Sequence, residues 1–391
     1  MKLRSRGAKL GWRMSCGALV LALGALCSVP ASAQNDLAFA RVKHLRRGVN
    51  LSNWYAQTDR DDYSPARLAS YTTQADFQLV RDLGFDHVRL SINPEPLLAD
   101  KQTGALDPAA MARLDGAVRG IVSVGLVVIL DIHPEPGWSH DSTETEDGTE
   151  RFFRFWKSFA QHFAGTDPEK VYFEVLNEPG RMDVYRWAGE QAKAIAVIRA
   201  EAPRHTIIAT GAMFGSIDSL VATEPVRDEN VIYTFHDYNP MEFTHQGAGF
   251  VMKELETLRD VPYPSSPENV APLLAGQRDP DVRKGLAWYG QQRWDVSMME
   301  KQIGVAVAWA NERHVPLYCG EFGVFRHFAP AVDRARWIGD MRRTLEKDGI
   351  GWDIWDYKGW FGMVTVKDGV PVVDEGVAEA LGVGKAGRSG R

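Results

Sequence analysis

Cysteine is scarce in this chain. Its 391 residues include three, and two of them, Cys16 and Cys27, fall in an N-terminal segment that we expect to be removed. Cys319 then stands alone, so the mature protein can form no intramolecular disulfide. Its stability must therefore come from a hydrophobic core, and a chain of this length can bury a large one.

The sequence also lacks an excess of positive charge. It has 45 basic and 51 acidic residues, a net charge of −6 at pH 7. This balance disfavours nucleic acid and anionic membranes as partners and suits a neutral polymer. A second long apolar run is missing as well, so we expect no membrane association once the N-terminal segment is gone.

The N-terminus has the pattern of a secretory signal peptide. Residues 1–13 carry five basic side chains and no acidic one, the apolar run MSCGALVLALGALCSVP follows, and ASAQ offers a cleavage site between small residues. This order predicts a signal peptide over 1–33, cleavage near Ala33 and secretion to the periplasm or the medium. Loss of the five basic residues would take the net charge from −6 to −11. A membrane anchor is the alternative, for which the run is short.

Apolar, strand-like runs recur along the rest of the chain. They alternate with segments whose apolar residues are spaced i, i+3, i+4, as in amphipathic helices. Eight such units predict an α/β fold in which a parallel sheet closes into a (β/α)8 TIM barrel. An open, doubly wound sheet is the runner-up, but RRGVNLSNWY lacks the glycine-rich turn usual after its first strand. The eight runs lie at 47–55, 87–92, 126–134, 171–179, 205–211, 231–240, 317–323 and 351–359.

We expect a single catalytic domain over 34–375. Residues 241–290, between the sixth and seventh runs, are rich in Pro, Gly, Ser and charge, which predicts a long functional loop rather than a second domain. The basic, Gly-rich residues 376–391 are predicted to form a flexible tail. The tail contains a GxGxxG match at 382–387, but it follows no strand and predicts no nucleotide site.

Two carboxylates stand at strand ends, where barrels of this kind carry their active sites. VYFEVLNEP ends an apolar run with Asn177 and Glu178, and LYCGEFG presents Glu321. The barrel places these two ends across one mouth. Glycoside hydrolysis needs such a pair, because one carboxylic acid protonates the leaving oxygen while the other attacks or activates water. Other candidates at the strand ends are Asn50, Asn53, Arg89, His133, His236, Tyr238 and Trp355.

Several of these motifs resemble glycoside hydrolase family 5, the cellulase A family. They are VLNEP, RLSI after GFDHV, ILDIHP, FHDY, CGEFG and GWDIWDYKG, and the likeness spans about residues 45–360. It implies a secreted, bacterial endoglucanase-like enzyme that uses a double displacement without a cofactor or metal. Glu178 would be the acid/base and Glu321 the nucleophile.

The resemblance also implies roles for the neighbours of the pair. Arg89 and Tyr238 would hydrogen-bond Glu321, and a nearby guanidinium favours the charged form of a carboxyl group. Asn177 would hold the sugar 2-hydroxyl, a contact that tightens in the transition state. The subsite at the cleaved bond would be lined by His133, His236 and Trp355, with Trp355 as its floor.

Some of these side chains have structural alternatives. Glu174 shares the strand parity of Glu178 and is interpreted, like Asp131, as a member of a buried polar network. His133 near Asp131 could be a metal ligand, but no HExxH or paired spacing supports a metal site.

Further substrate contacts are predicted beyond the mouth. Trp54, Trp138 and Trp360 follow strand ends and are predicted to be sugar platforms, since a pyranose packs on an aromatic ring. Asn53 and Lys358 are predicted to contact sugar hydroxyls.

The substrate is predicted to be β-1,4-glucan, attacked within the chain by a monomeric enzyme. Exo-acting β-1,3-glucosidase, mannanase and transglycosylase activities of the same family stay open, because the insertion at 241–290 could close one end of the cleft. A non-catalytic carbohydrate-binding protein is a further alternative, but it would be expected to lack one carboxylate. The remaining alternative function is that of a metal-dependent barrel hydrolase.

Overall fold

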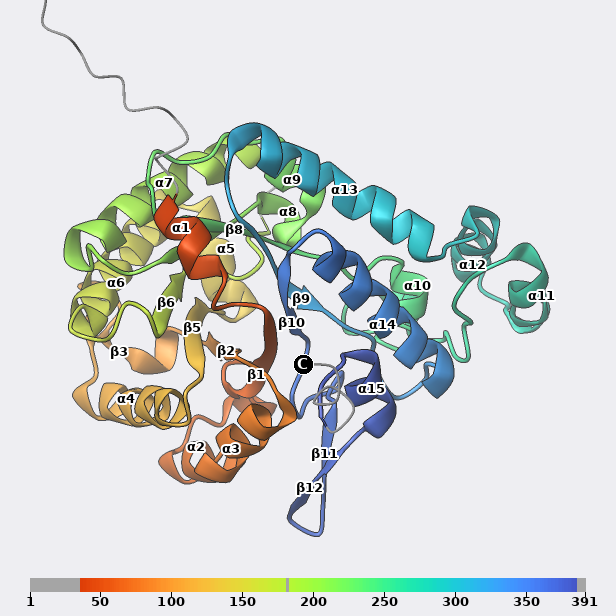
Figure 1. Cartoon of the computed structure of the whole chain (residues 1–391), viewed down its shortest axis with the longest axis horizontal. Helices are drawn as coiled ribbons and strands as arrows, with labels where there is room; N and C mark the ends of the chain where they lie inside the picture. The colour runs from red at the N-terminus through yellow and green to blue at the C-terminus, as the bar shows by residue number, and fades with distance from the viewer. Residues whose placement is uncertain (1–35, 181–182, 385–391) are drawn as a thin grey trace, which may run out of the picture.

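Eight parallel strands close into a barrel in the computed structural model, which describes residues 36–180 and 183–384 (Figure 1). Around the barrel the order is β1-β10-β9-β8-β7-β6-β5-β2, so the predicted (β/α)8 architecture is confirmed. The strands are β1 (Arg47–Tyr55), β2 (His87–Ile92), β5 (Val127–Ile132), β6 (Val171–Glu174), β7 (Ile207–Thr210), β8 (Val231–His236), β9 (Leu317–Phe322) and β10 (Gly351–Ile354).

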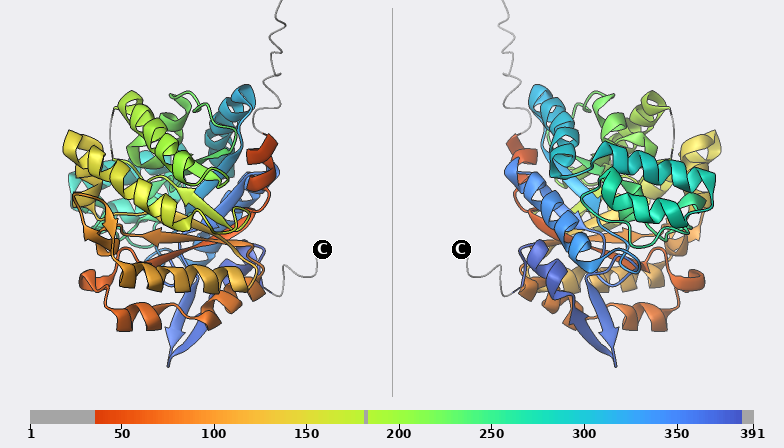
Figure 2. Two further views of the ribbon diagram at one scale, coloured as in Figure 1. Left: turned by 90° about the vertical axis from the view of Figure 1, so that its left-hand side faces the viewer. Right: turned by 90° about the vertical axis from the view of Figure 1, so that its right-hand side faces the viewer.

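Helices cover the outside of the barrel (Figure 2). Their sequences explain where they begin, as in α4, where Asp107 caps the first turn and Pro108 is the first helical residue. The apolar stripe of α6 buries Phe152, Phe155, Trp156, Phe159 and Phe163 against the sheet. The covering helices are α2 (Pro65–Tyr71), α3 (Gln74–Leu83), α4 (Pro108–Ser123), α5 (Pro136–Glu144), α6 (Glu146–Phe163), α7 (Val184–Glu201), α8 (Ala212–Gly215), α9 (Ile217–Val221), α13 (Val296–Arg313) and α14 (Ala331–Lys347).

The barrel interior changes character along its axis. Towards the N-terminal ends of the strands it is filled by an apolar cluster that includes Val127, Ile129 and Tyr172. The short helix α1 (Asp36–Val42) closes this end, where the Tyr172 hydroxyl donates to the carbonyl of Arg41. Two residues further along β5 the inward-facing position is Asp131, which is fully buried. From mid-height upward, polar side chains replace this apolar cluster and form a polar layer that leads to the C-terminal mouth. A buried His87–Asp353 pair, 3.2 Å apart, lies among the apolar residues below them.

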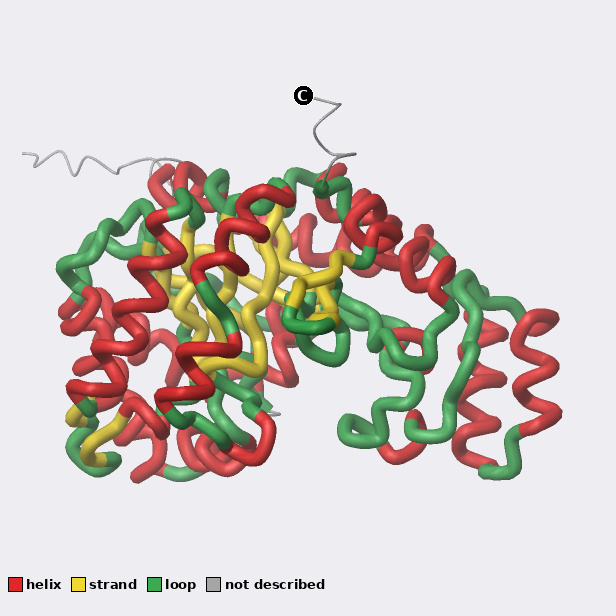
Figure 3. Tube along the Cα trace, turned by 90° about the horizontal axis from the view of Figure 1, so that it is seen from below, coloured by secondary structure: helices red, strands yellow, loops and turns green. Residues whose placement is uncertain are grey.

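The insertion at 241–290 differs from its prediction as a loop. It contains α10 (Met241–Thr244), α11 (Pro267–Gly276) and α12 (Pro280–Gln292), and the last two extend outward from the barrel (Figures 1 and 3). Ser266 caps α11 and Asp279 caps α12, and each is followed by a proline as the first helical residue. Proline is favoured there because that residue donates no hydrogen bond within the helix. Two of the prolines that predicted a loop, Pro267 and Pro280, in fact begin helices.

The tail predicted from residue 376 is also partly wrong. Asp374 caps α15 (Glu375–Ala380), and Leu381 and Val383 after it are almost completely buried. The packed part of the chain therefore reaches at least Val383, while 385–391 lie outside the described residues, as does the predicted signal peptide. Within the part that the structure describes, no helix has the length and apolar character needed to cross a membrane.

Two small hairpins follow the C-terminal ends of barrel strands. β3 (Leu98–Asp100) pairs with β4 (Ala105–Leu106) in the connection that follows β2. β11 (Val364–Lys367) pairs with β12 (Val370–Val373) after β10, and this hairpin projects from the body of the molecule (Figure 2).

Candidate active site

A fully buried arginine occupies the centre of the polar layer. The guanidinium of Arg89, on β2, donates two hydrogen bonds of 2.8 Å to the carboxylate of Glu174 on β6. It also donates to Asn50 on β1 at 3.0 Å, to Asn177 at 2.9 Å and to Glu321 on β9 at 2.7 Å. One cation thus ties β2 to β1, to β9 and to β6 with the turn after it, as the planar fork of arginine allows.

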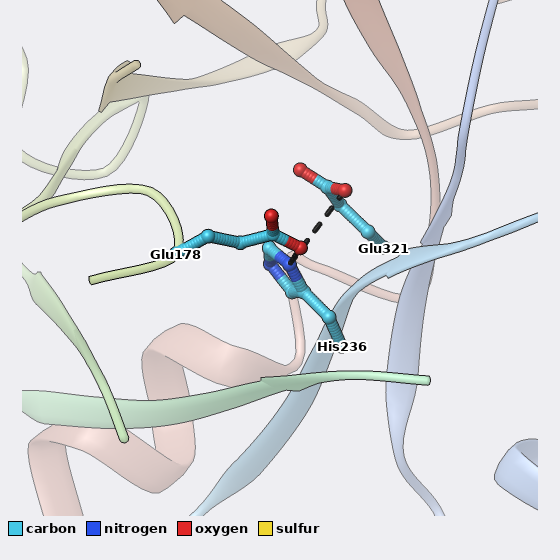
Figure 4. Close-up of side chains that lie close together, drawn as sticks. All are labelled: Glu178, His236 and Glu321. Atoms are coloured by element: carbon cyan, nitrogen blue, oxygen red, sulfur yellow. Dashed lines mark hydrogen bonds and ion pairs between the residues drawn. The ribbon is translucent and has the colours of Figure 1, made fainter. Parts of the chain in front are cut away.

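Two carboxylates and a histidine converge above this arginine (Figure 4). The side chains of Glu178, His236 and Glu321 point toward one another, and one ligand atom from each lies within 4.8 Å of the others. His236 Nδ1 is 2.9 Å from Glu178 Oε1 and 3.6 Å from Glu321 Oε2. The two acids predicted from distant segments of sequence therefore meet at one point.

Glu178 reaches this point because the chain turns sharply after β6. Its φ is +41°, in the left-handed region that costs a non-glycine residue about 1–3 kcal/mol. Backbone hydrogen bonds on either side hold the turn, from Asn177 N to Ile132 O at 2.8 Å and from Phe214 N to Pro179 O at 3.1 Å. The turn aims the carboxyl group across the mouth and leaves its side chain 30 % exposed, against 5 % for Glu321.

The surroundings distinguish the two carboxyl groups. Burial raises the pKa of both. Glu321 also accepts hydrogen bonds on both oxygens, from Arg89 at 2.7 Å and from the Tyr238 hydroxyl at 2.8 Å, which favour its charged form. Among the described residues, neither of these donors bonds Glu178. Glu321 is thus better suited to remain ionised, and Glu178 is better suited to carry and release a proton.

His133 is held in a defined tautomer beside the pair. Asn177 accepts from Arg89 through its carbonyl oxygen, so its amide nitrogen faces His133 Nε2, 3.1 Å away. The proton of the ring must then lie on Nδ1, which is 2.9 Å from Asp131. Burial lowers the pKa of His133 to about 4, so the ring is neutral at pH 7. Trp355 stacks on it, with centroids 5.6 Å apart and planes at 17°.

His236 is neutral for the same reason, since burial lowers its pKa to about 4. Gly320 leaves room for its ring, because a Cβ there would lie only 3.0 Å from Nε2. The absence of a side chain at this position lets the ring approach Glu178 and Glu321 together.

The three converging side chains could also be considered as a metal site, since each offers a ligand atom. The donors around Glu321 argue against that use. Arg89 and Tyr238 each direct a hydrogen at one oxygen of this carboxylate, and a guanidinium at 2.7 Å would repel a cation. The arrangement suits proton transfer and nucleophilic attack better than metal binding.

Comparison with protein families agrees with this geometry. The family model described as cellulase, glycosyl hydrolase family 5, matches residues 47–359. The chain belongs to glycosyl hydrolase family 5. It is therefore a glycoside hydrolase, as the paired carboxylates predicted.

Individual relatives of this family 5 chain share about a quarter of its sequence. Endoglucanase C of Acetivibrio thermocellus is 26 % identical over 336 residues, which cover 84 % of this chain and 96 % of the relative. Cellodextrinase A of Ruminococcus flavefaciens is 28 % identical over 313 residues, or 78 % and 83 % of the two chains. Structures of Thermotoga maritima Cel5A with cellobiose and with mannotriose are 26 % and 27 % identical. Both have a TM-score of 0.71 and cover 88 % of this chain and 99 % of that one.

Most residues predicted from the family 5 motifs lie together in the mouth. The predicted hydrogen bonds from Arg89 and Tyr238 to Glu321 are present. Glu174 and Asp131 belong to the buried network around Arg89, as interpreted from sequence. The roles of the lining residues toward a sugar stay predictions. Those residues are His133, Asn177, His236 and Trp355.

Two predicted sugar contacts are wrong. Trp54 is 3 % exposed, packs on Phe77 and donates to the carbonyl of Leu68 at 2.8 Å, so it belongs to the core between sheet and helices. Its strand loses regular alternation because the register shifts between Leu51 and Tyr55.

Lys358 is the other wrong assignment. Its ammonium group pairs with Asp76 at 2.8 Å and donates to the carbonyl of Tyr71 at 2.8 Å, in a site that leaves the side chain 11 % exposed. The lysine thus ties the connection after β10 to the α2–α3 region, and its charge is used inside the fold.

Asn53 and Trp138 are surface-accessible but have partners other than the carboxylates. Asn53 donates to the hydroxyl of Ser52 at 3.3 Å. Trp138, on α5, contacts Phe152 and Phe155 of α6 and lines a separate cavity. Their contact with substrate stays a prediction.

An exposed aromatic patch beside the mouth was only partly anticipated. Phe250 and Trp360 are 57 % and 53 % exposed, with centroids 4.8 Å apart, and both contact Phe325. Phe325 in turn contacts Phe361, which packs on Tyr238. Phe325 and Phe361 are each 6 % exposed, so they support the two exposed rings from below. We call Phe250, Phe325, Trp360 and Phe361 the aromatic patch. Trp360 follows a predicted strand, but nothing in the sequence around Phe250 distinguishes it from a core phenylalanine.

The donor set on Glu321 predicts a pH effect. Tyr238→Phe removes a hydrogen bond that stabilises the carboxylate, so the pKa of Glu321 should rise. A nucleophile is lost as pH falls through its pKa, and the acidic limb of kcat/KM should therefore move to higher pH. A hydrogen bond to a charged group contributes about 1.5–3 kcal/mol, which corresponds to about one to two pH units. The pH profile of kcat/KM measures it.

Tyr357→Phe is the matched control. The Tyr357 hydroxyl also donates to a buried carboxylate, Asp76, at 2.9 Å, but this pair lies outside the catalytic network. In this control the acidic limb of the kcat/KM profile should lie at the same pH as in the unmodified protein. If Tyr238→Phe also leaves that limb in place, the role given to the Tyr238 hydroxyl is contradicted.

Proposed function

We propose that the protein is an endo-acting glucanase that cleaves β-1,4-glucan chains of the cellulose type with retention of configuration. One observation in particular supports a retaining mechanism. The ligand oxygens of Glu178 and Glu321 lie within 4.8 Å of each other. Retaining enzymes separate their carboxyl groups by about 5–5.5 Å, while inverting enzymes need about 6.5–9.5 Å to admit a water.

In the first step Glu321 attacks the anomeric carbon. Glu178 donates its proton to the glycosidic oxygen, the bond from that oxygen to the anomeric carbon breaks, and a glycosyl ester forms on Glu321. The hydrogen bonds from Arg89 and Tyr238 keep the attacking carboxylate charged and fix its direction. The partly exposed Glu178 faces the position of the departing chain.

In the second step a water attacks the same carbon. Glu178, now ionised, takes a proton from that water, and the ester bond to Glu321 breaks to release the sugar. Two inversions return the original β configuration. The neutral His236 ring at 2.9 Å can stabilise either form of Glu178, because a neutral imidazole offers a donor or an acceptor.

Asn177 is suited to hold the sugar 2-hydroxyl. Its carbonyl oxygen is used by Arg89 and one amide hydrogen faces His133. The second amide hydrogen is left for a ligand. Because both sides of the amide are fixed, this donor is positioned before the substrate arrives, which is the condition for stabilising a transition state.

Several observations support a cellulose-type chain as substrate. Family 5 relatives include an endoglucanase and a cellodextrinase, and the related Cel5A structure holds cellobiose. Trp355 and the two exposed rings of the aromatic patch, Phe250 and Trp360, offer surfaces on which uncharged sugars can stack. Mannan is the second candidate, since Cel5A was also captured with mannotriose.

We further propose that the enzyme is exported and that residues 1–33 are removed on the way. The proposal rests on the basic, apolar and small-residue segments of the N-terminus. N-terminal sequencing of protein recovered outside the cytoplasm should start at Gln34. An uncleaved N-terminus on the exported protein would contradict it.

The substrate and stereochemistry can be tested together. Reducing-sugar release from carboxymethylcellulose, lichenan, laminarin and mannan should be greatest on the first two, and proton NMR should show the β anomer as the first product. Glu178→Gln and Glu321→Gln should each lose at least about a thousandfold in kcat, because each removes one partner of the pair. Glu300→Gln, in an exposed ion pair on α13, is the matched control. An α anomer as first product, or preference for laminarin, would refute the proposal.

A further inference from the structure

A cavity opens at the catalytic end of the barrel, apart from the carboxylate pair. Its volume is about 470 Å³, within the range of about 300–1,000 Å³ that is typical of small-molecule sites. It lies between the β3–β4 segment, which follows β2, and helix α5, which follows β5. Residues that line it are Glu95, Lys101, Gln102, Trp138, Asp141 and Arg151.

Trp138 gives this cavity a rigid aromatic wall. Its ring meets Phe152 at 5.8 Å and 78°, and Phe155 at 6.1 Å and 80°. Edge-to-face contacts of this kind fix a ring in place. The tryptophan is nevertheless only partly buried, so part of its indole remains available to a ligand. A preoriented, accessible indole is the feature on which a pyranose ring can stack.

The charges of the cavity are already paired with one another. Lys101 forms an ion pair with Glu95, and Arg151 pairs with Asp147 and lies 3.5 Å from Asp141. Paired charges offer little net attraction to an anion or a cation, while their carboxylates keep lone pairs that can accept from hydroxyl groups. This lining favours a neutral, hydroxyl-rich ligand.

The cavity lies across the mouth from the aromatic patch. In the barrel order, β2 and β5 are neighbours on one side, while the patch comes from connections after β8, β9 and β10 on the other. Figure 3 shows the β3–β4 hairpin and the insertion after β8 at opposite sides of the same end of the molecule. A glucan chain laid across Glu178 and Glu321 from the patch would run toward the cavity.

We propose that the Trp138 cavity is a distal sugar-binding site that holds a glucose unit of the chain being cleaved, away from the scissile bond. This inference rests on the proposed glucanase function. It makes Trp138 a determinant of affinity for long chains, with no effect on the chemistry at the carboxylates.

Calorimetric titration of the inactive Glu321→Gln protein tests the proposal. Cellohexaose should bind about 3- to 10-fold more weakly when Trp138→Ala is added, the size of effect expected for a lost aromatic contact. Cellobiose, too short to span both sites, should bind equally with and without the change. Trp288→Ala is the matched control, because this tryptophan is 50 % exposed on α12.

Kinetics on the active enzyme supply the second readout. Trp138→Ala should raise KM for cellohexaose and leave kcat, and all constants for an aryl β-cellobioside, unchanged. Trp138 also packs on α6, so its replacement could disturb the fold. Gln102→Trp is therefore a second variant, which fills the cavity from its exposed rim. It should likewise raise KM for cellohexaose and leave kcat unchanged.

Three results would count against the inference, and they are distinguishable. Unchanged cellohexaose affinity in both variants would overturn the distal site alone. An equal loss for cellobiose and cellohexaose would overturn it as well, because the effect would then be general. Failure of the unmodified protein to cleave any β-1,4-glucan would overturn the proposed function itself.

Discussion

The active end of this barrel depends on one buried cation, the guanidinium of Arg89. Burying an unpaired charge costs several kcal/mol, so this side chain is tolerated only because carboxylate and amide oxygens from other strands of the barrel surround it. The dependence is mutual. Without Arg89, Glu174 and Glu321 would face each other as buried acids, and burial alone already raises the pKa of both. The bidentate pair with Glu174 anchors the arginine at mid-height of the barrel, and its remaining donors reach upward to Glu321 and Asn177.

The same network sets the protonation of the mouth. Burial raises the pKa of Asp131 to about 7 and lowers those of His133 and His236 to about 4, so both imidazoles are neutral near pH 7. Charge is thereby concentrated on Arg89 and on the carboxylates that accept its hydrogen bonds, Glu174 and the proposed nucleophile Glu321, and the proposed acid/base is free to carry a proton. The strained turn at Glu178 adds geometry to this electrostatic division, since it places a partly exposed acid opposite a buried anion. Environments that differ in this way assign different roles to two chemically identical residues.

Much of this could be predicted from the sequence, and the failures have physical causes. Alternating apolar runs predicted the barrel, and the strand-end polar motifs predicted the carboxylate pair with its donors, because both signals are local. Trp54 was misassigned because a register shift in β1 cannot be seen in sequence, and Lys358 because its partner Asp76 is far along the chain. Pro267 and Pro280 indicate a loop by composition although each begins a helix, and the helix near the C-terminus is stabilised by tertiary contacts that a local pattern does not contain.

The central claim is that Glu321, held by Arg89, attacks the sugar. Its most direct test is labelling with 2,4-dinitrophenyl 2-deoxy-2-fluoro-β-cellobioside, whose good leaving group departs without help and whose fluorine slows hydrolysis of the glycosyl ester. Peptide mass mapping after this treatment should find the fluorosugar on the peptide that contains Glu321, with one equivalent bound as activity is lost. A label on Glu178, or inactivation without any covalent sugar, would contradict the assignment of nucleophile and acid.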